Sequence, residues 1–429
     1  MQSERSTLAL EKALQVLIDY RGKSPAKSEA GVPVISAKVV KGGRILHPIE
    51  QTIDPKYYPV WMTRGLPEIG DVVMTTEGPL GEVAQLDAQT AKYALGQRVV
   101  CMRGKEGVLD NTFFKFLLTS PTQQAILHSF ATGTTVEGIS QRSLRAIPLV
   151  LPPYGYQVVL GRLLGTLDEK IELNRQMNKT LEAMVRAIFK DWFVDFGPTR
   201  AKAAGRAPYL TPDLWALFPD SLDTEGKPEG WLAGTLHEVC ELNSESWGEG
   251  SKPVQVEYVD LANTKWGTIE STETHLWDAA PSRARRILRS GDTIVGTVRP
   301  GNGSYAFVAR DGLTGSTGFA VLRPKIPSYR ELTYCAATSP ENIDRLAHLA
   351  DGGAYPAVSP DLVANTGLII GLSSVTETFS AICGPLINLV EANKQESQTL
   401  AQTRDFLLPK LMSGEIIVRK AETDLGTVL

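Results

Sequence analysis

The chain has 429 residues, of which 42% are hydrophobic and 21% charged, with a formal net charge of −4. This composition is typical of a globular protein of two or three domains, and the apolar runs are far too short to span a bilayer. The four cysteines lie far apart, at no spacing that zinc sites use, which favours buried reduced thiols. The N-terminus lacks the apolar core of a signal peptide, so we expect a cytoplasmic protein that does not bind a membrane.

The sequence repeats itself at an offset of 219 residues. Asn174 corresponds to Asn393, and residues 70–73 line up with residues 291–294 after a further shift of two. Solenoid repeats are only about 20–50 residues long, so this offset indicates two copies of a whole module. Each copy has the pattern of a strand-rich globular domain followed by one long helix.

In chain order, residues 8–20 carry apolar side chains at a spacing that fits one helical turn or a capping segment. Short β-rich runs at 32–35 and 72–75, bounded by glycine and proline, predict strands. The apolar run 113–118 fits a helix that faces a sheet. The second copy has strand-like runs of the same kind at residues 254–259, 293–298 and 319–322.

A long helix is the clearest prediction in the first copy. Two prolines at 152–153 precede it and Gly-Pro at 197–198 follows it, as expected for residues that begin and end helices. Apolar residues recur every seven positions, with a second set three residues later at Leu163, Met177 and Met184, which is typical of a coiled-coil seam. The predicted first seam positions of the two copies are Leu160, Leu167, Asn174, Leu181 and Ile188, then Leu386, Asn393, Leu400 and Leu407.

The second helix has less regular chemistry. Ile382 and Leu389 take the second seam position there, and Pro385 should begin or kink the helix. Asn174 and Asn393 share one heptad position, where buried amides would fix the register at a cost in stability; the alternative is that both amides face solvent. If the helices pair within one chain, the twofold relation between the copies makes them antiparallel.

Residues 197–231, between the copies, are rich in proline, glycine and acid, which predicts a linker with little regular structure. Charge is uneven, because residues 1–205 carry 25 Lys and Arg against 20 Asp and Glu, and the remainder carries 19 against 28. A nucleic-acid reader shows a basic stripe rather than a basic total, and the arginines at 283–299 could form one. The alternative is an ordinary solvated face.

Two segments mimic catalytic motifs. Residues 151–154 look like the Pro-Pro-Tyr element of amino-methyltransferases, but leucine stands where those enzymes need a polar side chain for the base amino group. Asp220 and Glu225 mimic a nuclease metal motif, yet their spacing leaves little room for a second strand to bring the carboxylates together. The sequence contains no GxxxxGKS or GxxxxGKT phosphate loop, and its histidines show no ligand spacing. We therefore predict no catalytic residue, no metal site and no cofactor in this chain.

Several segments carry a resemblance to a known family. Residues 147–196, which end in WFVDF, resemble the central conserved region of the specificity (S) subunits of type I restriction–modification enzymes. FPDSLDTEGKPEGW at 218–231 is similar to the segment that leads into their second target-recognition domain, and LLPKLMSGEI at 407–416 resembles their C-terminal conserved region. GDVVMTTEGPLGEVA at 70–84 is similar to the core of their recognition domains. The resemblance covers nearly the whole chain.

The repeat and the resemblance together predict an α+β fold. Two strand-rich α/β globular target-recognition domains would be separated by two long helices that pair as an antiparallel coiled coil, with an internal pseudo-twofold repeat. The expected divisions are target-recognition domain 1 at 1–151, a central conserved long helix at 152–196, a linker at 197–231, target-recognition domain 2 at 232–374, and a C-terminal conserved helix and tail at 375–429.

The resemblance also implies a function. The chain would be the non-catalytic DNA-binding specificity subunit of a type I restriction–modification complex, and each domain would read one half of an asymmetric, bipartite site in double-stranded DNA. The coiled coil would fix the spacer, and the helices would dock two methyltransferase (modification) subunits and endonuclease/translocase (restriction) subunits. S-adenosylmethionine, ATP and Mg would belong to those partners. The alternative is a non-catalytic coiled-coil scaffold that binds only protein.

DNA recognition needs Lys and Arg for phosphates, and Arg, Lys, Asn or Gln for base edges. Each candidate could equally be an ordinary surface charge. The first domain offers Arg21, Lys23, Lys38, Lys41, Arg44, Arg64, Arg103 and Lys105. The second domain offers Lys252, Lys265, Arg283, Arg285, Arg286, Arg299 and Asn302.

Overall fold

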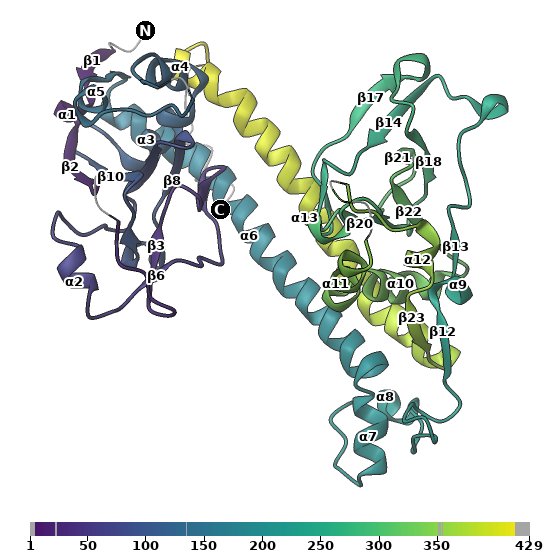
Figure 1. Cartoon of the computed structure of the whole chain (residues 1–429). Coiled ribbons are helices and arrows are strands. Elements are labelled where there is room, and N and C mark those ends of the chain that lie inside the picture. The colour runs from purple at the N-terminus through teal and green to yellow at the C-terminus, as the bar shows by residue number, and fades with distance from the viewer. Residues whose placement is uncertain (1–4, 22–23, 134, 351–352, 354, 417–429) are drawn as a thin grey trace, which may run out of the picture. The chain divides into compact units, whose positions relative to one another are not determined.

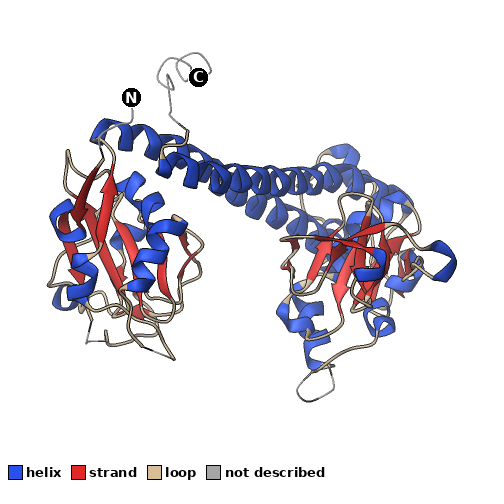
Figure 2. Ribbon diagram, turned by 90° about the horizontal axis from the view of Figure 1, so that it is seen from above, coloured by secondary structure: helices blue, strands red, loops and turns tan. Residues whose placement is uncertain are grey.

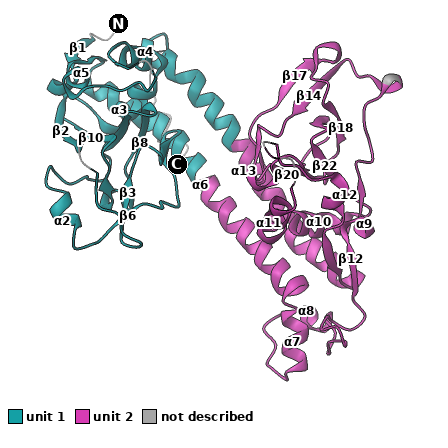
Figure 3. Cartoon of the chain, in the orientation of Figure 1, with its two compact units in different colours: residues 1–172, 397–429 teal, residues 173–396 magenta. Residues whose placement is uncertain are grey.

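The computed structural model describes residues 5–21, 24–133, 135–350, 353 and 355–416. The chain divides into two compact units: unit 1 combines Met1–Glu172 with Ser397–Leu429, and unit 2 is Leu173–Glu396 (Figure 3). Each unit contains one globular copy together with part of each long helix. The described residues include no helix that is long and apolar enough to cross a membrane.

Unit 1 is built on a four-stranded antiparallel sheet in the order β2-β10-β7-β8 (Figure 1). These strands are β2 (Leu14–Asp19), β10 (Val99–Gly104), β7 (Val72–Thr76) and β8 (Leu80–Gln85). Helix α3 (Asn111–Thr119) packs on this sheet and is followed by α4 (Pro121–Ser129). The sheet is buried on both faces: Val72 and Met74 point into the core with the helices, whereas Val73 belongs to a second core. This explains why β7 is apolar without alternation.

The second core of unit 1 lies between that sheet and a smaller set of strands. A three-stranded sheet has the order β6-β3-β9, and a two-residue hairpin joins β4 to β5. The smaller elements are β1 (Ser6–Ala9), α1 (Leu10–Ala13), β3 (Val32–Ile35), β4 (Val40–Lys41), β5 (Arg44–Ile45), β6 (Thr52–Ile53), α2 (Tyr58–Trp61), the 3-10 turn Thr90–Lys92, β9 (Ala94–Leu95), α5 (Gln141–Ala146) and β11 (Pro148–Leu151).

Unit 2 repeats this plan. Its main sheet has the order β13-β22-β19-β20 and carries helix α10, while a second four-stranded sheet has the order β17-β14-β21-β18. Figure 2 shows the strands of each unit gathered into sheets with helices against them. The elements are β12 (Leu232–Thr235), α9 (Leu236–Val239), β13 (Cys240–Leu242), β14 (Gln255–Val259), β15 (Thr264–Lys265), β16 (Thr268–Ile269), β17 (Glu273–Leu276), β18 (Ala284–Leu288), β19 (Thr293–Gly296), β20 (Tyr305–Phe307), β21 (Leu313–Ser316), β22 (Phe319–Pro324), α10 (Arg330–Ala337), α11 (Pro340–His348), α12 (Pro360–Ala364) and β23 (Gly367–Ile370), with 3-10 turns at Glu249–Ser251, Trp277–Ala279, Pro300–Asn302 and Pro327–Tyr329.

Equivalent residues perform equivalent jobs in the two copies. The side chain of Ser120 caps α4 by accepting a hydrogen bond from the backbone N–H of Gln123, and Ser339 caps α11 through Asn342 in the same way. In both helices a proline follows the cap, at a position where no intrahelical N–H is needed. The predicted two-copy α+β fold is therefore confirmed, as are the predicted strands and the helix over 113–118.

The two long helices, α6 (Tyr154–Phe189) and α13 (Ser373–Ser413), pair antiparallel within each unit. In unit 2, the amide of Asn178 donates to the carbonyl oxygen of Val390 at 3.2 Å, and one turn earlier Asn174 donates to Glu396 at 2.6 Å. In unit 1, Arg404 pairs with Asp168 at 2.6 Å. Residue numbers rise on one helix as they fall on the other, which defines the antiparallel sense.

At the first seam position, the structure buries Leu160, Asn174 and Asn393. The amide of Asn393 donates to the Asn178 side chain at 2.8 Å, so the alternative with both amides in solvent does not apply. The remaining predicted members, which are partly buried, are Leu167, Leu181, Ile188, Leu386, Leu400 and Leu407.

The predicted second seam position is wrong at three residues: Met177, Met184 and Leu389 are 39%, 48% and 42% exposed. Val185 and Val390, at the position four residues after the first, are only 2% exposed. Leu163 and Ile382, the other predicted members, are partly buried and pack against the cores of their units. The error has a physical cause: this buried row includes polar residues, such as Asn178, that a count of apolar side chains does not find.

Pro385 does not begin the second helix, since α13 begins at Ser373. Upstream residues Phe379 and Cys383 are fully buried in the core of unit 2, and this packing holds the first turns of the helix. Tertiary burial here outweighs the hydrogen bond that proline removes.

The segment 197–231 is more ordered than its composition predicts. It forms α7 (Gly197–Ala203) and α8 (Pro212–Ala216), each with a proline in its first turn. Phe218 and Trp231 are buried in the core of unit 2, where Trp231 lies 5.5 Å from the Phe193 ring between centroids. A π-helical turn, Lys190–Val194, ends the long helix and delivers Phe193 to that core.

Candidate nucleic-acid interface

Each copy contains the same buried ion pair between an aspartate and an arginine. In unit 1, Arg103 bonds both carboxylate oxygens of Asp71, at 2.7 and 2.9 Å. In unit 2, Arg323 bonds both oxygens of Asp292, at 2.9 Å each. Both aspartates are 1% exposed. Such bidentate pairs are strong and directional, and they tie two neighbouring strands of each main sheet together.

The same carboxylates also fix the turn that precedes the strand. Asp71 accepts a hydrogen bond from the backbone N–H of Glu68 at 2.9 Å, and Asp292 accepts one from the N–H of Arg289 at 2.8 Å. Arg103 also pairs with the exposed Glu68 at 2.6 Å. The sequence-predicted contact residue Arg103 therefore has its side chain committed to the fold of its own domain.

Two other candidates of the first domain gather at the end of β2. Arg21 bonds the Asp19 carboxylate through its backbone N–H and its Nε, at 2.9 and 2.8 Å. Arg64 donates to the Asp19 carbonyl oxygen at 2.5 Å and lies over the Tyr20 ring, 5.6 Å from its centroid. The structure thus brings together Arg21 and Arg64, which are far apart in the sequence.

The remaining candidates of the first domain lie on its loops and hairpins. Lys41 and Arg44 face each other across the two-residue β4–β5 hairpin, and Lys38 precedes it. Lys105 is exposed, and its backbone N–H bonds the carbonyl oxygen of Ala13. Lys23 lies outside the described residues.

In the second domain, a row of arginines runs along β18. Arg285 lies over the Trp277 ring at 4.4 Å, and Arg286 donates to the Ser246 hydroxyl at 3.2 Å. Burial lowers the pKa of Arg286 from its ordinary value. Arg283 is exposed and 3.8 Å from Asp260. The pairing of β18 shifts register between Ala284 and Arg286, and the three arginines have different neighbours, so the row is not one regular basic stripe.

The other candidates of the second domain lie on separate loops. Lys265 belongs to the β15–β16 hairpin, Arg299 precedes the 3-10 turn that follows β19, and Asn302 is the last residue of that turn. Asn302 is exposed. Lys252 is exposed in the loop before β14. The hairpin and the turn are adjacent, because the backbone N–H of Trp266 bonds the carbonyl oxygen of Gly303 at 2.6 Å.

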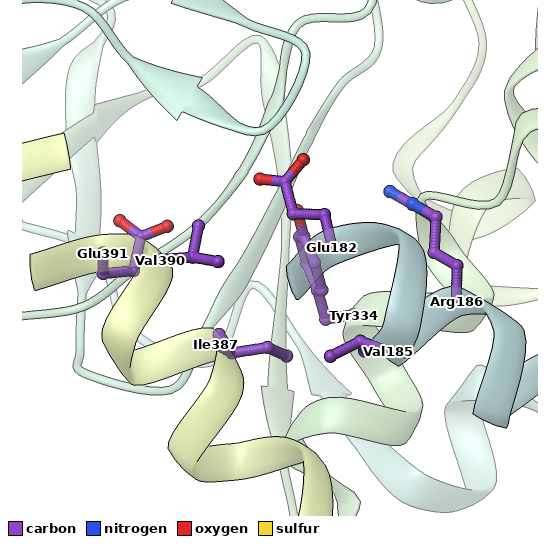
Figure 4. A pocket seen from close by; sticks show the side chains of 7 residues that line it. All are labelled: Glu182, Val185, Arg186, Tyr334, Ile387, Val390 and Glu391. Atoms are coloured by element: carbon purple, nitrogen blue, oxygen red, sulfur yellow. The ribbon is translucent and has the colours of Figure 1, made fainter. Parts of the chain in front are cut away.

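A pocket in unit 2 lies where the two long helices meet α10 (Figure 4). Arg186 donates to the Thr338 carbonyl oxygen at 3.1 Å and lies over the Tyr334 ring at 5.9 Å. Burial raises the pKa of Tyr334 and also that of Glu391. The pocket is lined by Glu182, Val185, Arg186, Tyr334, Ile387, Val390 and Glu391. Its contacts seat the helices on the globular copy. Across the described ranges, no cluster of three or more His, Cys, Asp or Glu side chains could hold a metal ion.

Comparison with known proteins finds similarity to one family. A model of the type I restriction modification DNA specificity domain matches residues 22–183. The type I restriction enzyme MjaIX specificity subunit of Methanocaldococcus jannaschii is 22% identical over 366 residues, which cover 82% of this chain and 78% of the relative. The HindI specificity subunit of Haemophilus influenzae is 22% identical over 402 residues, which cover 81% and 86%.

A solved fold agrees. The crystal structure of a type I restriction-modification system S subunit from M. genitalium has a TM-score of 0.58 and 15% identity, with 96% of each chain covered. The chain is thus similar to type I restriction–modification specificity subunits, in its first copy by the family model and over about four fifths of its length by the two relatives. The family match spans the first copy and its long helix, and the second copy repeats that fold down to its buried Arg323–Asp292 pair.

Sequence reasoning missed three residues of this specificity-subunit fold. Arg323 is not among the residues predicted from the sequence, although its offset of 220 from Arg103 marks it as the equivalent arginine. Trp266 and Tyr355, which are 60% and 72% exposed, flank two of the predicted contact residues. The signal for Trp266 was its position in a two-residue hairpin, where a glycine-rich tip is the norm.

Proposed function

We propose that the chain is the DNA-binding specificity subunit of a type I restriction–modification complex. Each globular copy reads one half of an asymmetric, bipartite site in double-stranded DNA. One observation carries the proposal: the two copies share a buried framework, with the same Asp–Arg pair and the same capped helices, but carry different residues on their loops. A repeated scaffold with unlike loops suits the reading of two unlike half-sites.

The candidate contact residues fit the two layers of DNA recognition. Exposed lysines such as Lys41 and Lys105 suit phosphates, which supply affinity and set the protein on the duplex. Exposed Arg283 and Asn302 suit base edges, where bidentate hydrogen bonds carry sequence information. Arg103 is the weakest member of the set, because the buried Asp71 already holds its guanidinium.

The paired helices set the spacing between the half-sites and dock two methyltransferase subunits and the endonuclease/translocase subunits. Supporting this role, several large apolar side chains on α6 and α13 are exposed rather than turned into the seam. They are Leu173, Met177, Met184, Leu389 and Phe406. Because the helices are related by the repeat, each should present a similar surface, which suits two copies of one partner.

This chain supplies recognition and no catalysis. S-adenosylmethionine, ATP and Mg act in the partner subunits. Support comes from the relatives, which are named as specificity subunits, and from the leucine that replaces the polar residue of the methyltransferase-like Pro-Pro-Tyr element. Calorimetry of the isolated chain with S-adenosylmethionine should show no heat of binding.

The test is to co-express the chain with its methyltransferase partner, capture genomic fragments with the complex, and sequence them. We expect a two-part motif with a fixed gap. Lys41→Ala should weaken capture in the first half of the motif, and Arg283→Ala in the second half. Capture of fragments without a motif by an intact complex would refute the proposal and favour a scaffold that binds only protein.

A further inference from the structure

The two copies differ sharply at the tip of one equivalent hairpin. In unit 1, Gly42-Gly43 joins β4 to β5, and Gly43 forms a parallel bridge with Ala84. In unit 2, Trp266-Gly267 joins β15 to β16, and Gly267 forms the equivalent bridge with Ala306. The backbone is the same: φ is 59° at Gly42 and 46° at Trp266. Tryptophan therefore occupies a left-handed position that favours glycine.

A second position shows the same exchange. Glu77 bridges Gly138 in unit 1, and Val298 bridges Ala357 in unit 2, so the residues that follow them are equivalent. Those residues are Gly78, with φ 48°, and Arg299, with φ 47°. Only four non-glycine residues in the described ranges have positive φ, and two of them are Trp266 and Arg299.

These substitutions do not serve burial. Trp266 is 60% exposed and Arg299 is also exposed, so neither side chain repays its unfavourable backbone by filling a core. The first copy forms the same hairpin and the same turn with glycine. Left-handed non-glycine residues that persist where glycine would suffice are typical of functional sites.

Both residues belong to or contact the same turn, residues 299–303. The Trp266 indole packs against Gly303, where an added Cβ would be 2.5 Å from the ring, and forms a T-shaped pair with Tyr305 at 6.1 Å between centroids. The indole is held by these contacts and is still 60% exposed. Arg299 begins the tight turn that ends at Gly303 and lies 5.1 Å from the centroid of the exposed Tyr355 ring. This turn packs against α11.

We propose that Trp266, Arg299 and Tyr355 form a stacking surface for DNA bases that only the second copy possesses. Exposed aromatic and guanidinium planes bind the faces of bases, and Lys265 and Asn302 beside them offer a cation and an amide. Both charged residues of the hairpin and the turn, Lys265 and Arg299, are basic, which favours a polyanion over an acidic-rimmed protein site. This inference rests on the proposed function.

Stacking on a base within a duplex requires an opened or kinked step, because paired bases expose only their edges. The second half-site would therefore be deformed on binding, and the first would not, since Gly42 and Gly78 offer no planar side chain. The two copies would then differ in how they deform the bound DNA as well as in the sequence that each prefers.

The experiment uses the complex of the full chain with its methyltransferase partner, and duplexes that carry its selected target. Trp266→Gly and Arg299→Gly copy the glycines of unit 1 and relieve the backbone, so both should fold at least as well as the parent. We expect each to raise the Kd for the target duplex about tenfold or more. Trp266→Phe, which keeps a planar ring, should recover most of the affinity, whereas Trp266→Asn, which tolerates left-handed backbone, should not. Leu276→Ala, at an exposed side chain in the same domain, is the control and should leave Kd unchanged.

A second readout tests stacking itself. With 2-aminopurine placed in turn along the second half-site, the parent complex should change the fluorescence at one step, and Trp266→Gly should abolish that change. Unchanged Kd and unchanged fluorescence in Trp266→Gly would overturn the inference. A variant that no longer binds the methyltransferase subunit but still binds DNA normally would also overturn it. If the parent complex itself selects no DNA sequence, the proposed function fails; if it does and the variants match it, only this inference fails.

Discussion

The buried Asp–Arg pairs give the sharpest prediction on stability. Asp71→Asn and Asp292→Asn preserve volume but remove the charge that Arg103 and Arg323 bond twice. Loss of one partner from a fully buried ion pair costs about 3–5 kcal/mol. The arginine side chains here are 15% and 19% exposed, and each has a second, more exposed carboxylate, so water and that neighbour will recover part of the loss. We therefore expect each substitution to lower the free energy of unfolding by about 2–4 kcal/mol.

The assay is urea denaturation of the full chain, followed by tryptophan fluorescence and circular dichroism. Because the chain has two compact units, Asp71→Asn should shift the transition of unit 1 and Asp292→Asn that of unit 2. Asp213→Asn, at an exposed aspartate in α8, is the matched control and should change stability by less than about 0.5 kcal/mol. If both buried variants unfold like the control, the pairs do not hold the sheets together and the reasoning is refuted.

Three further outcomes are expected. Val390→Ala should destabilise the chain by about 1–3 kcal/mol in thermal melts, and Leu389→Ala by less than about 0.5 kcal/mol, because only Val390 is buried in the seam. The opposite order would support the seam that apolar spacing predicts. Asn393→Leu removes a buried donor at 2.8 Å and should cost about 1–3 kcal/mol, with equal or higher stability counting against a role in the seam. Hydrogen bonds from Arg289 lower the pKa of Glu245 from 4.5 to about 2, so its contribution is complete above about pH 4.5 and is lost as pH falls toward 2; Glu245→Gln should flatten that part of the stability profile.

Much of the fold could be predicted from the sequence because it is periodic. The offset of 219 residues identified two copies, and the seven-residue repeat identified the long helix and its first seam position. Apolar spacing does not reveal the second seam position, because two of its members are polar. Asn178 is buried there, and Arg404 is partly buried and pairs with Asp168. Apolar counting favoured Met177 instead, and the structure leaves that side chain exposed. A search for apolar periodicity does not detect seam positions that are polar.

The candidate contact residues could be predicted by type but not by availability. Arg103 and Lys105 are two positions apart in loop-like sequence, yet only Lys105 is exposed. What separates them is Asp71, which lies 32 residues away in the sequence and becomes a neighbour only when β7 pairs with β10. Whether a charged side chain is held in an ion pair within its own domain depends on residues far away in the sequence, so local composition does not predict it.

An internal repeat supplies a control that a single domain lacks. Where the copies agree, as at Asp71 and Asp292, the shared residue is required by the fold that both copies have. Where they differ on the same backbone, as at Gly42 and Trp266, the fold does not require the larger side chain, because the first copy forms the same hairpin with glycine. The fold alone therefore does not account for tryptophan at this position. In a protein whose two copies are proposed to read unlike DNA, such positions are where half-site preference should be sought, ahead of the more numerous basic residues whose charge alone made them candidates.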